Sequence, residues 1–293
     1  MEATATVAST TATGAATMPE PAPAAGAALQ QALREFAGAP AVLIALDFDG
    51  CLAPFVLDPA DARPLPQSST ALADLARVPG THLALVSGRP VADLNRLAAP
   101  PPHTRLVGSH GAEEAEVDAA GTARIHPLDL TTQQQATLRA VTGAVEQLAE
   151  QHPPAWVEHK PAAAVLHTRA LPGPQAEALL AEAMSGPGQW EGVHAISGNQ
   201  VVELAVVDAT KGQSLQRLRR QVRPAAGGPG QLPVLYAGDD VTDETALEVL
   251  GRDDVGIKVG EAPTVAPYRV SDEQAVAEVL TQLALWRTSL PTL

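Results

Sequence analysis

Residues 41–46 read Ala-Val-Leu-Ile-Ala-Leu and lead directly into Asp47-Phe48-Asp49-Gly50. A short apolar run that ends in Asp and Gly is typical of a strand buried on both faces of a parallel sheet. In open α/β sheets, ligands bind at the carboxyl ends of the strands. This stretch therefore predicts both the centre of an α/β sheet and a candidate site beside it.

Four more apolar strands are predicted after the strand at 41–46, and helical patterns separate them. The strands are expected at 82–86, 104–107, 233–237 and 255–259, and the helices at 68–77, 90–97, 211–221, 242–250 and 272–286. Alternation of strands and helices at this spacing favours a doubly wound, Rossmann-like α/β domain with a mostly parallel sheet.

The middle of the chain has a different pattern. Strand-like pieces at 114–117, 122–126, 156–159, 163–169 and 201–205 mix with helical patterns at 131–151 and 174–184. We therefore expect an inserted α+β cap domain at 112–205 within a core domain formed by 27–111 and 206–293. Residues 1–26 are almost all Ala, Thr, Pro, Gly and Ser, and this composition predicts a disordered tail.

Composition excludes several classes of function. The 293-residue chain has a formal net charge of −14 and no basic run, which argues against nucleic acid and anionic membrane surfaces as partners. No window has the roughly 18 apolar residues of a membrane helix, and the N-terminus does not resemble a signal peptide. The single cysteine, Cys51, permits no internal disulfide. We expect a cytoplasmic protein that acts on a small molecule.

The two carboxylates of the opening motif suit phosphoryl chemistry. Asp47 could attack phosphorus and form an aspartyl-phosphate, while Asp49 could protonate the leaving oxygen and later take a proton from water. Two carboxylates facing a phosphate would repel it, so this chemistry requires a divalent cation. A lone Asp-x-Asp-Gly after a strand is more often a simple turn.

Three further motifs follow in order along the chain. Ser87 and Gly88 follow the strand 82–86, where a hydroxyl and free backbone N–H groups could hold a phosphate. Lys211 begins a predicted helix and could neutralise phosphate and nucleophile. Asp239, Asp240 and Asp243 form an acidic cluster whose oxygens suit Mg²⁺. Singly, these read as a helix cap, a surface lysine and a capped helix start, but the ordered set is hard to obtain by chance.

This ordered set resembles the haloacid-dehalogenase-type phosphotransferases. The resemblance implies that Asp47 is the nucleophile, Asp49 the general acid and base, and Ser87 and Lys211 the phosphate ligands. It also implies Mg²⁺ held by Asp47, the backbone of Asp49, and Asp239, with Asp240 or Asp243 supporting. The chain departs from the family at Cys51, where Thr or Val is usual.

More specific matches lie in the middle of the chain. The stretches 108–113, 157–160, 165–169 and 197–203, which read GSHGAE, VEHK, VLHTR and SGNQVVE, resemble trehalose-6-phosphate phosphatases. The resemblance implies that Glu158, Lys160 and Glu203 hold the disaccharide, and we add His110 and Asn199 to the expected substrate-binding residues. It further implies that the cap closes over the substrate.

The expected reaction is Mg²⁺-dependent hydrolysis of trehalose 6-phosphate. Three alternatives stay open at this point. The first is another capped sugar phosphatase, acting on sucrose phosphate or mannosyl-phosphoglycerate. The second is a catalytically silent subunit that senses sugar phosphate or supports a partner synthase. The third is transfer of the phosphoryl group to a second sugar. A trehalose-phosphate synthase is a candidate partner, and a monomer is expected.

Overall fold

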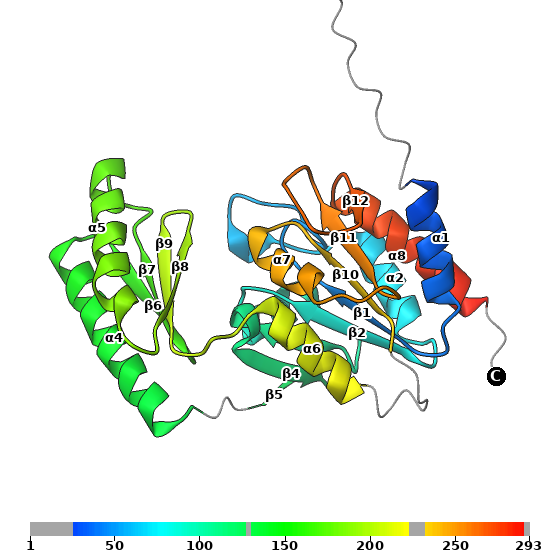
Figure 1. Ribbon diagram of the computed structural model, residues 1–293, viewed down its shortest axis with the longest axis horizontal. Coiled ribbons are helices and arrows are strands. Elements are labelled where there is room, and N and C mark those ends of the chain that lie inside the picture. The colour runs from blue at the N-terminus through cyan, green and yellow to red at the C-terminus, as the bar shows by residue number, and fades with distance from the viewer. Residues whose placement is uncertain (1–25, 127–129, 223–231, 290–293) are drawn as a thin grey trace, which may run out of the picture.

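The computed structural model describes residues 26–126, 130–222 and 232–289. The expected tail at 1–26 lies outside these ranges except for Gly26. The described chain forms two sheets, one of eight strands and one of four. Figure 1 shows them as two side-by-side units.

The larger sheet is parallel except at one edge. In sheet order its strands are β12 (Tyr268–Val270), β11 (Val255–Val259), β10 (Val234–Gly238), β1 (Val42–Leu46), β2 (Thr81–Val86), β3 (Arg105–Gly108), β4 (Glu113–Val117) and β5 (Ala123–His126). The first six run parallel, and β4 and β5 are added antiparallel. The mostly parallel α/β sheet is therefore confirmed.

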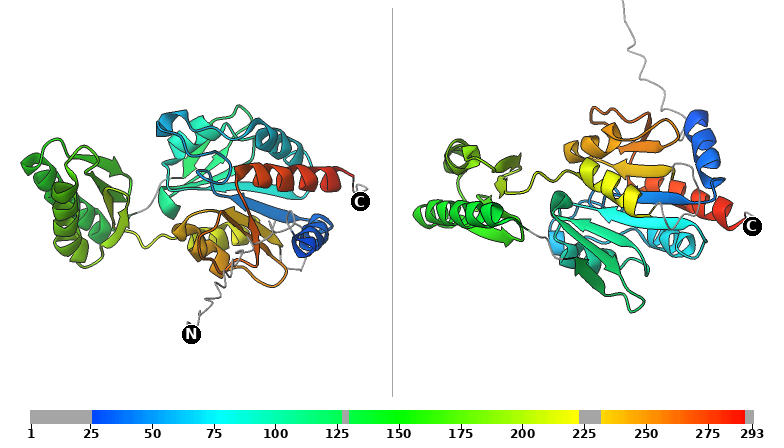
Figure 2. Two further views of the ribbon diagram at one scale, coloured as in Figure 1. Left: turned by 90° about the horizontal axis from the view of Figure 1, so that it is seen from above. Right: turned by 60° about the horizontal axis from the view of Figure 1, so that its bottom comes forward.

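Strand β1 lies inside this sheet and is buried on both faces. Val42, Ile44 and Leu46 belong to a core cluster with α1 (Ala27–Ala37), α2 (Pro66–Leu75), α3 (Val91–Ala98) and α8 (Glu273–Thr288). Leu43 and Ala45 belong to a second cluster with α6 (Lys211–Val222) and α7 (Val241–Glu248). Alternate side chains of a strand point to opposite faces, so two helical layers require a continuous apolar run. Figure 2 shows helices on both sides of the sheet.

The smaller sheet is antiparallel, in the order β6 (Trp156–Lys160), β7 (Ala163–His167), β9 (Val201–Ala205) and β8 (His194–Gly198). Helices α4 (Thr132–Gln151) and α5 (Gly173–Ser185) cover one of its faces with a separate apolar cluster. We call residues 130–205 the inserted unit. Its helices lie on the side away from the larger unit, so the uncovered face of the sheet is turned toward it (Figure 1).

One expectation about the sheets is wrong. The strands at 114–117 and 122–126 were assigned to the inserted domain beginning at 112, but β4 pairs with β3 and β5 with β4 in the larger sheet. The alternation Glu114-Ala115-Glu116-Val117 indicates a half-buried strand without showing which sheet it joins. That choice depends on a long-range register, in which Leu106 lies opposite Ala115.

Two strands, β8 and β12, were not predicted. β8 reads His-Ala-Ile-Ser-Gly and is an edge strand whose side chains are exposed or partly exposed, so it lacks an apolar run. β12 has only three residues and is the other edge strand beside β11. Edge strands carry the weakest local signal because neighbours cover them on fewer sides.

Candidate active site

The carboxyl ends of three neighbouring strands carry the predicted site. β1 pairs with β10 on one side and with β2 on the other, so Leu46 lies opposite both Ala237 and Leu85. Asp47, Asp239 and Ser87 therefore leave the sheet at the same edge. The structure brings these three predicted residues to one place, as expected for the crevice of an open α/β sheet.

A buried ion cluster lies at the centre of the site. The Lys211 Nζ is 3.0 Å from Asp47 Oδ1 and 2.7 Å from Asp243 Oδ1, and all three side chains are at most 6% exposed. Asp243 Oδ1 also accepts a 2.6 Å hydrogen bond from the Tyr236 hydroxyl, and its Oδ2 accepts one from the Asp240 N–H. Asp243 thus holds the lysine, and the lysine holds the nucleophile candidate.

Close packing of α6 against α7 makes this cluster possible. Gly212 follows Lys211 on α6, and a Cβ there would lie 2.1 Å from the Thr245 carbonyl oxygen of α7. A larger residue would separate the helices and with them Lys211 and Asp243. The Gly212 N–H also donates to the Thr245 hydroxyl, which fixes the contact.

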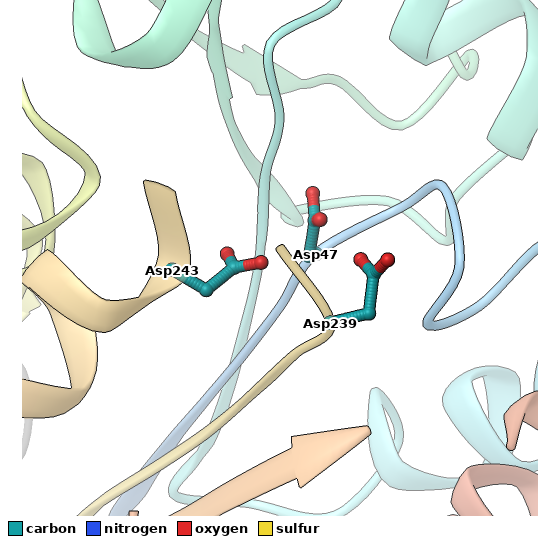
Figure 3. A group of neighbouring side chains, drawn as sticks. All are labelled: Asp47, Asp239 and Asp243. Atoms are coloured by element: carbon teal, nitrogen blue, oxygen red, sulfur yellow. The ribbon is translucent and has the colours of Figure 1, made fainter. Parts of the chain in front are cut away.

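Negative charge is in excess in this cluster. Oxygens of Asp47, Asp239 and Asp243 lie within 4.8 Å of one another, and Figure 3 shows the three carboxyl groups approaching from different segments. Burial raises the pKa of Asp47 well above its usual value, Lys211 opposes the rise, and Asp243 adds to it. Burial, with a contribution from Asp243, also raises the pKa of Asp239 to about 6. Burial alone would lower the pKa of Lys211, but Asp47 and Asp243 outweigh it and the pKa is raised.

These oxygens suit a hard divalent cation. Asp47 and Asp239 are the better candidates to hold one, because both Asp243 oxygens already accept hydrogen bonds. Gly50 leaves room for the Asp239 side chain. Its φ is +68°, and a Cβ on this residue would lie 2.4 Å from Asp239 Oδ2. Only glycine adopts that backbone readily, so the turn after β1 can approach Asp239 closely.

Asp49 and Ser87 are placed by one residue, Arg89. The Arg89 Nε and Nη2 each donate to an Asp49 oxygen at 2.6 Å, and the Arg89 N–H donates to Ser87 Oγ at 3.2 Å. The Asp49 side chain is therefore held by an arginine and is not one of the three clustered carboxylates. Arg89 directly follows the predicted phosphate seat at Ser87 and Gly88, but its contact with Asp49 is visible only in the structure.

Cys51 is fully buried beside the nucleophile candidate. Its Sγ donates to the Ala237 carbonyl oxygen at 3.5 Å. Burial, followed by the charge of Asp47, raises the pKa of the thiol well above its usual value. A neutral, buried thiol is a poor nucleophile, so the structure indicates a packing role for Cys51.

A second buried lysine, Lys258, contacts the Asp240 backbone and was not predicted from the sequence. The Lys258 side chain is 1% exposed and donates to the Asp240 carbonyl oxygen and to Glu244 Oε1 at 3.1 and 3.0 Å. It fixes the turn that carries the acidic motif. The signal was present, because Lys258 interrupts the otherwise apolar strand Val255–Val259.

The uncovered face of the inserted unit carries a second ion pair. Lys160 of β6 donates to Glu203 of β9 at 2.7 Å, and these side chains are 8% and 10% exposed. Together with His110 and Thr210 of the larger unit, they line a cavity of about 160 Å³ between the units. The His110 ring lies against Gly88, since a Cβ on that glycine would be 2.5 Å from the ring. The cavity therefore adjoins the expected phosphate seat.

Two other predicted substrate residues lie outside this cavity. Glu158 Oε2 is 3.0 Å from His167 Nε2, and that imidazole stacks on Trp156 with ring centroids 3.8 Å apart. Asn199 is exposed in the turn between β8 and β9. Glu158 shares the uncovered face with Lys160 and Glu203, and it lies in the same row across the sheet as Glu203, because both residues pair with Val165.

Comparison with known proteins identifies the family. The family model described as trehalose-phosphatase matches residues 45–274. The chain belongs to the trehalose-phosphatase family.

A trehalose-phosphate phosphatase of Mycobacterium leprae is 32% identical over 255 residues, which are 81% of this chain and 56% of that protein. An uncharacterized glycosyl hydrolase of Mycobacterium tuberculosis is 34% identical over 82% of this chain and 18% of its own length. The chain thus spans less than two thirds of these curated relatives.

Solved structures of the family share the fold. The C-terminal domain of trehalose-6-phosphate phosphatase from C. albicans superposes with a TM-score of 0.69 at 22% identity, covering 87% of this chain and 96% of that one. A protein described as related to trehalose-6-phosphate phosphatase has a TM-score of 0.61 at 22% identity, over 83% and 97%. No described helix is long and apolar enough to cross a membrane.

Proposed function

We propose that this chain hydrolyses trehalose 6-phosphate to trehalose and inorganic phosphate. The observation that carries the proposal is that the family match includes Asp47, Lys211 and Asp239, and that these residues meet at one buried sheet edge. Relatives named as trehalose-phosphate phosphatases support the substrate.

In the proposed first step, an Asp47 oxygen attacks phosphorus. The bond between phosphorus and the sugar oxygen breaks, and that oxygen takes a proton from Asp49. An aspartyl-phosphate remains on Asp47. In the second step, water attacks phosphorus, Asp49 takes its proton, and the bond between phosphorus and Asp47 breaks.

The other residues hold charge and orientation. Lys211 neutralises part of the phosphoryl charge and keeps Asp47 in place, and Ser87 with the backbone at Gly88 forms the phosphate seat. Mg²⁺, held by Asp47, Asp239 and the backbone of Asp49, would supply the positive charge that lets a phosphate approach two carboxylates. Asp240 and Asp243 support this arrangement through the Asp240 N–H and Lys211.

The inserted unit would act as a cap that selects the sugar. Lys160, Glu203 and His110 line the cavity next to the phosphate seat, where charged groups can accept and donate hydrogen bonds to sugar hydroxyls. Glu158 and Asn199 would contact the more distant glucose. A synthase that makes the substrate is the proposed partner, since a bifunctional synthase/phosphatase of Thermoproteus tenax is 31% identical over 85% of this chain.

Phosphate release from a panel of sugar phosphates tests the proposal. The panel contains trehalose 6-phosphate, sucrose phosphate, mannosyl-phosphoglycerate and glucose 6-phosphate, each with and without Mg²⁺. Trehalose 6-phosphate is expected to be the best substrate and to require Mg²⁺. Equal rates on all four would refute the trehalose assignment. Binding without Mg²⁺-dependent turnover would instead indicate a silent sensor.

A further inference from the structure

The Arg89 side chain contacts three neighbouring residues, Asp49, Pro59 and Phe48. Its Nε and Nη2 donate to the two oxygens of Asp49, both at 2.6 Å, and its Nη1 donates to the Pro59 carbonyl oxygen at 2.8 Å. The guanidinium carbon lies 5.3 Å from the ring centroid of buried Phe48. A planar fork held in this way fixes a carboxylate in orientation as well as in position.

The Arg89 backbone is anchored separately from its side chain. Its N–H donates to Ser87 Oγ at 3.2 Å, and its carbonyl oxygen accepts from the Ser109 N–H at 2.9 Å. A change of side chain therefore leaves the backbone of the phosphate seat in place. Among the described residues, Asp49 has no hydrogen-bond partner for its side chain other than Arg89.

We propose that Arg89 is the positioning residue of Asp49, and that it holds the carboxyl group in the one orientation that serves both proton transfers. The inference rests on the proposed role of Asp49 in phosphoryl transfer. A carboxylate has about four lone-pair sites, so a two-pronged arginine contact leaves one free site on each oxygen for the moving proton. A loosely held Asp49 would lose orientation, and misplacement by about 1 Å can cost about 100-fold in rate.

Burst kinetics with p-nitrophenyl phosphate distinguish positioning from a structural role. Its leaving group needs no proton, so attack by Asp47 is expected to survive in R89M, while hydrolysis of the phosphoenzyme slows. R89M should release about one nitrophenolate per enzyme in a fast burst, followed by turnover about 10- to 100-fold slower than that of the unmodified protein. With trehalose 6-phosphate, kcat should fall by a similar factor without a burst, and KM should change less than about threefold.

Four further variants complete the experiment. D49N should show the same burst, and D49N/R89M should match D49N, because Arg89 acts through Asp49. R96M removes a comparable but exposed arginine, which contacts Asp93 at 2.8 Å on the surface, and should behave like the unmodified protein. R89K, which keeps the charge but not the fork, should give intermediate turnover with the burst retained, and it carries the test if R89M does not fold.

Several results would overturn the inference. Loss of the burst in folded R89M, or a much higher KM, would show that Arg89 supports attack or binds phosphate directly. Additive losses in D49N/R89M would show that the two residues act independently. Because p-nitrophenyl phosphate is used, these results do not depend on the sugar. Failure of the unmodified protein on trehalose 6-phosphate alone would reject the proposed substrate and leave the Arg89 inference in place.

Discussion

Lys211 and Lys160 are both nearly buried lysines in ion pairs, but their surroundings differ. Lys211 contacts two carboxylates, and one of these is also held by a tyrosine hydroxyl and a backbone N–H. Lys160 contacts Glu203 alone among the described residues and lies on the wall of a cavity. The first arrangement is complete before a ligand arrives, whereas the second can exchange its partner for sugar hydroxyls. We therefore expect chemistry at Lys211 in the larger unit and substrate selection at Lys160 in the inserted unit.

The largest expected effect concerns the Lys211 cluster of the larger unit. D47N removes the proposed nucleophile while keeping its shape, and kcat should fall by about 10⁴-fold or more. Phosphate release under saturating substrate measures it, and far-ultraviolet circular dichroism checks that the fold is kept. Retention of more than about a tenth of the activity would exclude Asp47 as the nucleophile.

Replacing the two lysines sharpens the comparison. K211M leaves Asp47 and Asp243 buried without their cation, so it should lower kcat by about 10²- to 10³-fold and destabilise the fold by about 3 to 5 kcal/mol. Urea denaturation monitors the stability. A variant that loses activity but keeps its full stability would show that the buried cluster is less coupled than its distances indicate.

K160M should act on binding instead. Loss of charged hydrogen bonds to the sugar should raise KM by about 10- to 100-fold and leave kcat within a few-fold. H159Q is the matched control, because His159 is the neighbouring residue but contacts Glu146 of α4 on the covered face. A fall in kcat with unchanged KM in K160M would contradict the division between the two units.

The smallest effect concerns Asp239 and pH. Its pKa of about 6 in the metal-free fold is above the unfolded value of 3.8, so the folded state binds this proton more tightly. The resulting stability is present at low pH and is lost as pH rises through about 6. Because the Asp239 residue is partly exposed, the loss should be about 1 to 2 kcal/mol. Urea denaturation without metal at pH 4.5 and 7.5 measures it.

D239N should reduce this pH dependence, because an amide does not ionise. The affinity of the unmodified protein for Mg²⁺ should rise with pH up to about 6 and then level off, since metal and proton compete for the same oxygens. Calorimetric titration with Mg²⁺ measures this. A Mg²⁺ affinity independent of pH between 5 and 7 would show that Asp239 does not hold the metal.

Local sequence alone determined the centre of the molecule. The run 41–46 followed by Asp47 is apolar on every residue because two helical layers cover it, so strand, burial and the place of Asp47 follow from one pattern. Asp239 and Ser87 were predictable for the same reason, as each follows a buried strand. Gly50 and Gly212 directly follow Asp49 and Lys211 in the sequence, but only the structure explains these glycines, by their close approach to Asp239 and to Thr245.

Only the tertiary structure decided which segments meet. It placed β4 and β5 on the larger sheet, joined Lys160 to Glu203 across β7, and set the Arg89 fork on Asp49 across 40 residues of sequence. Strand burial is a local property and is written into consecutive residues. Pairing between distant side chains depends on register and helix packing, which no short stretch specifies. The sequence therefore determined where the candidate site lies, and the fold decided how its residues are held.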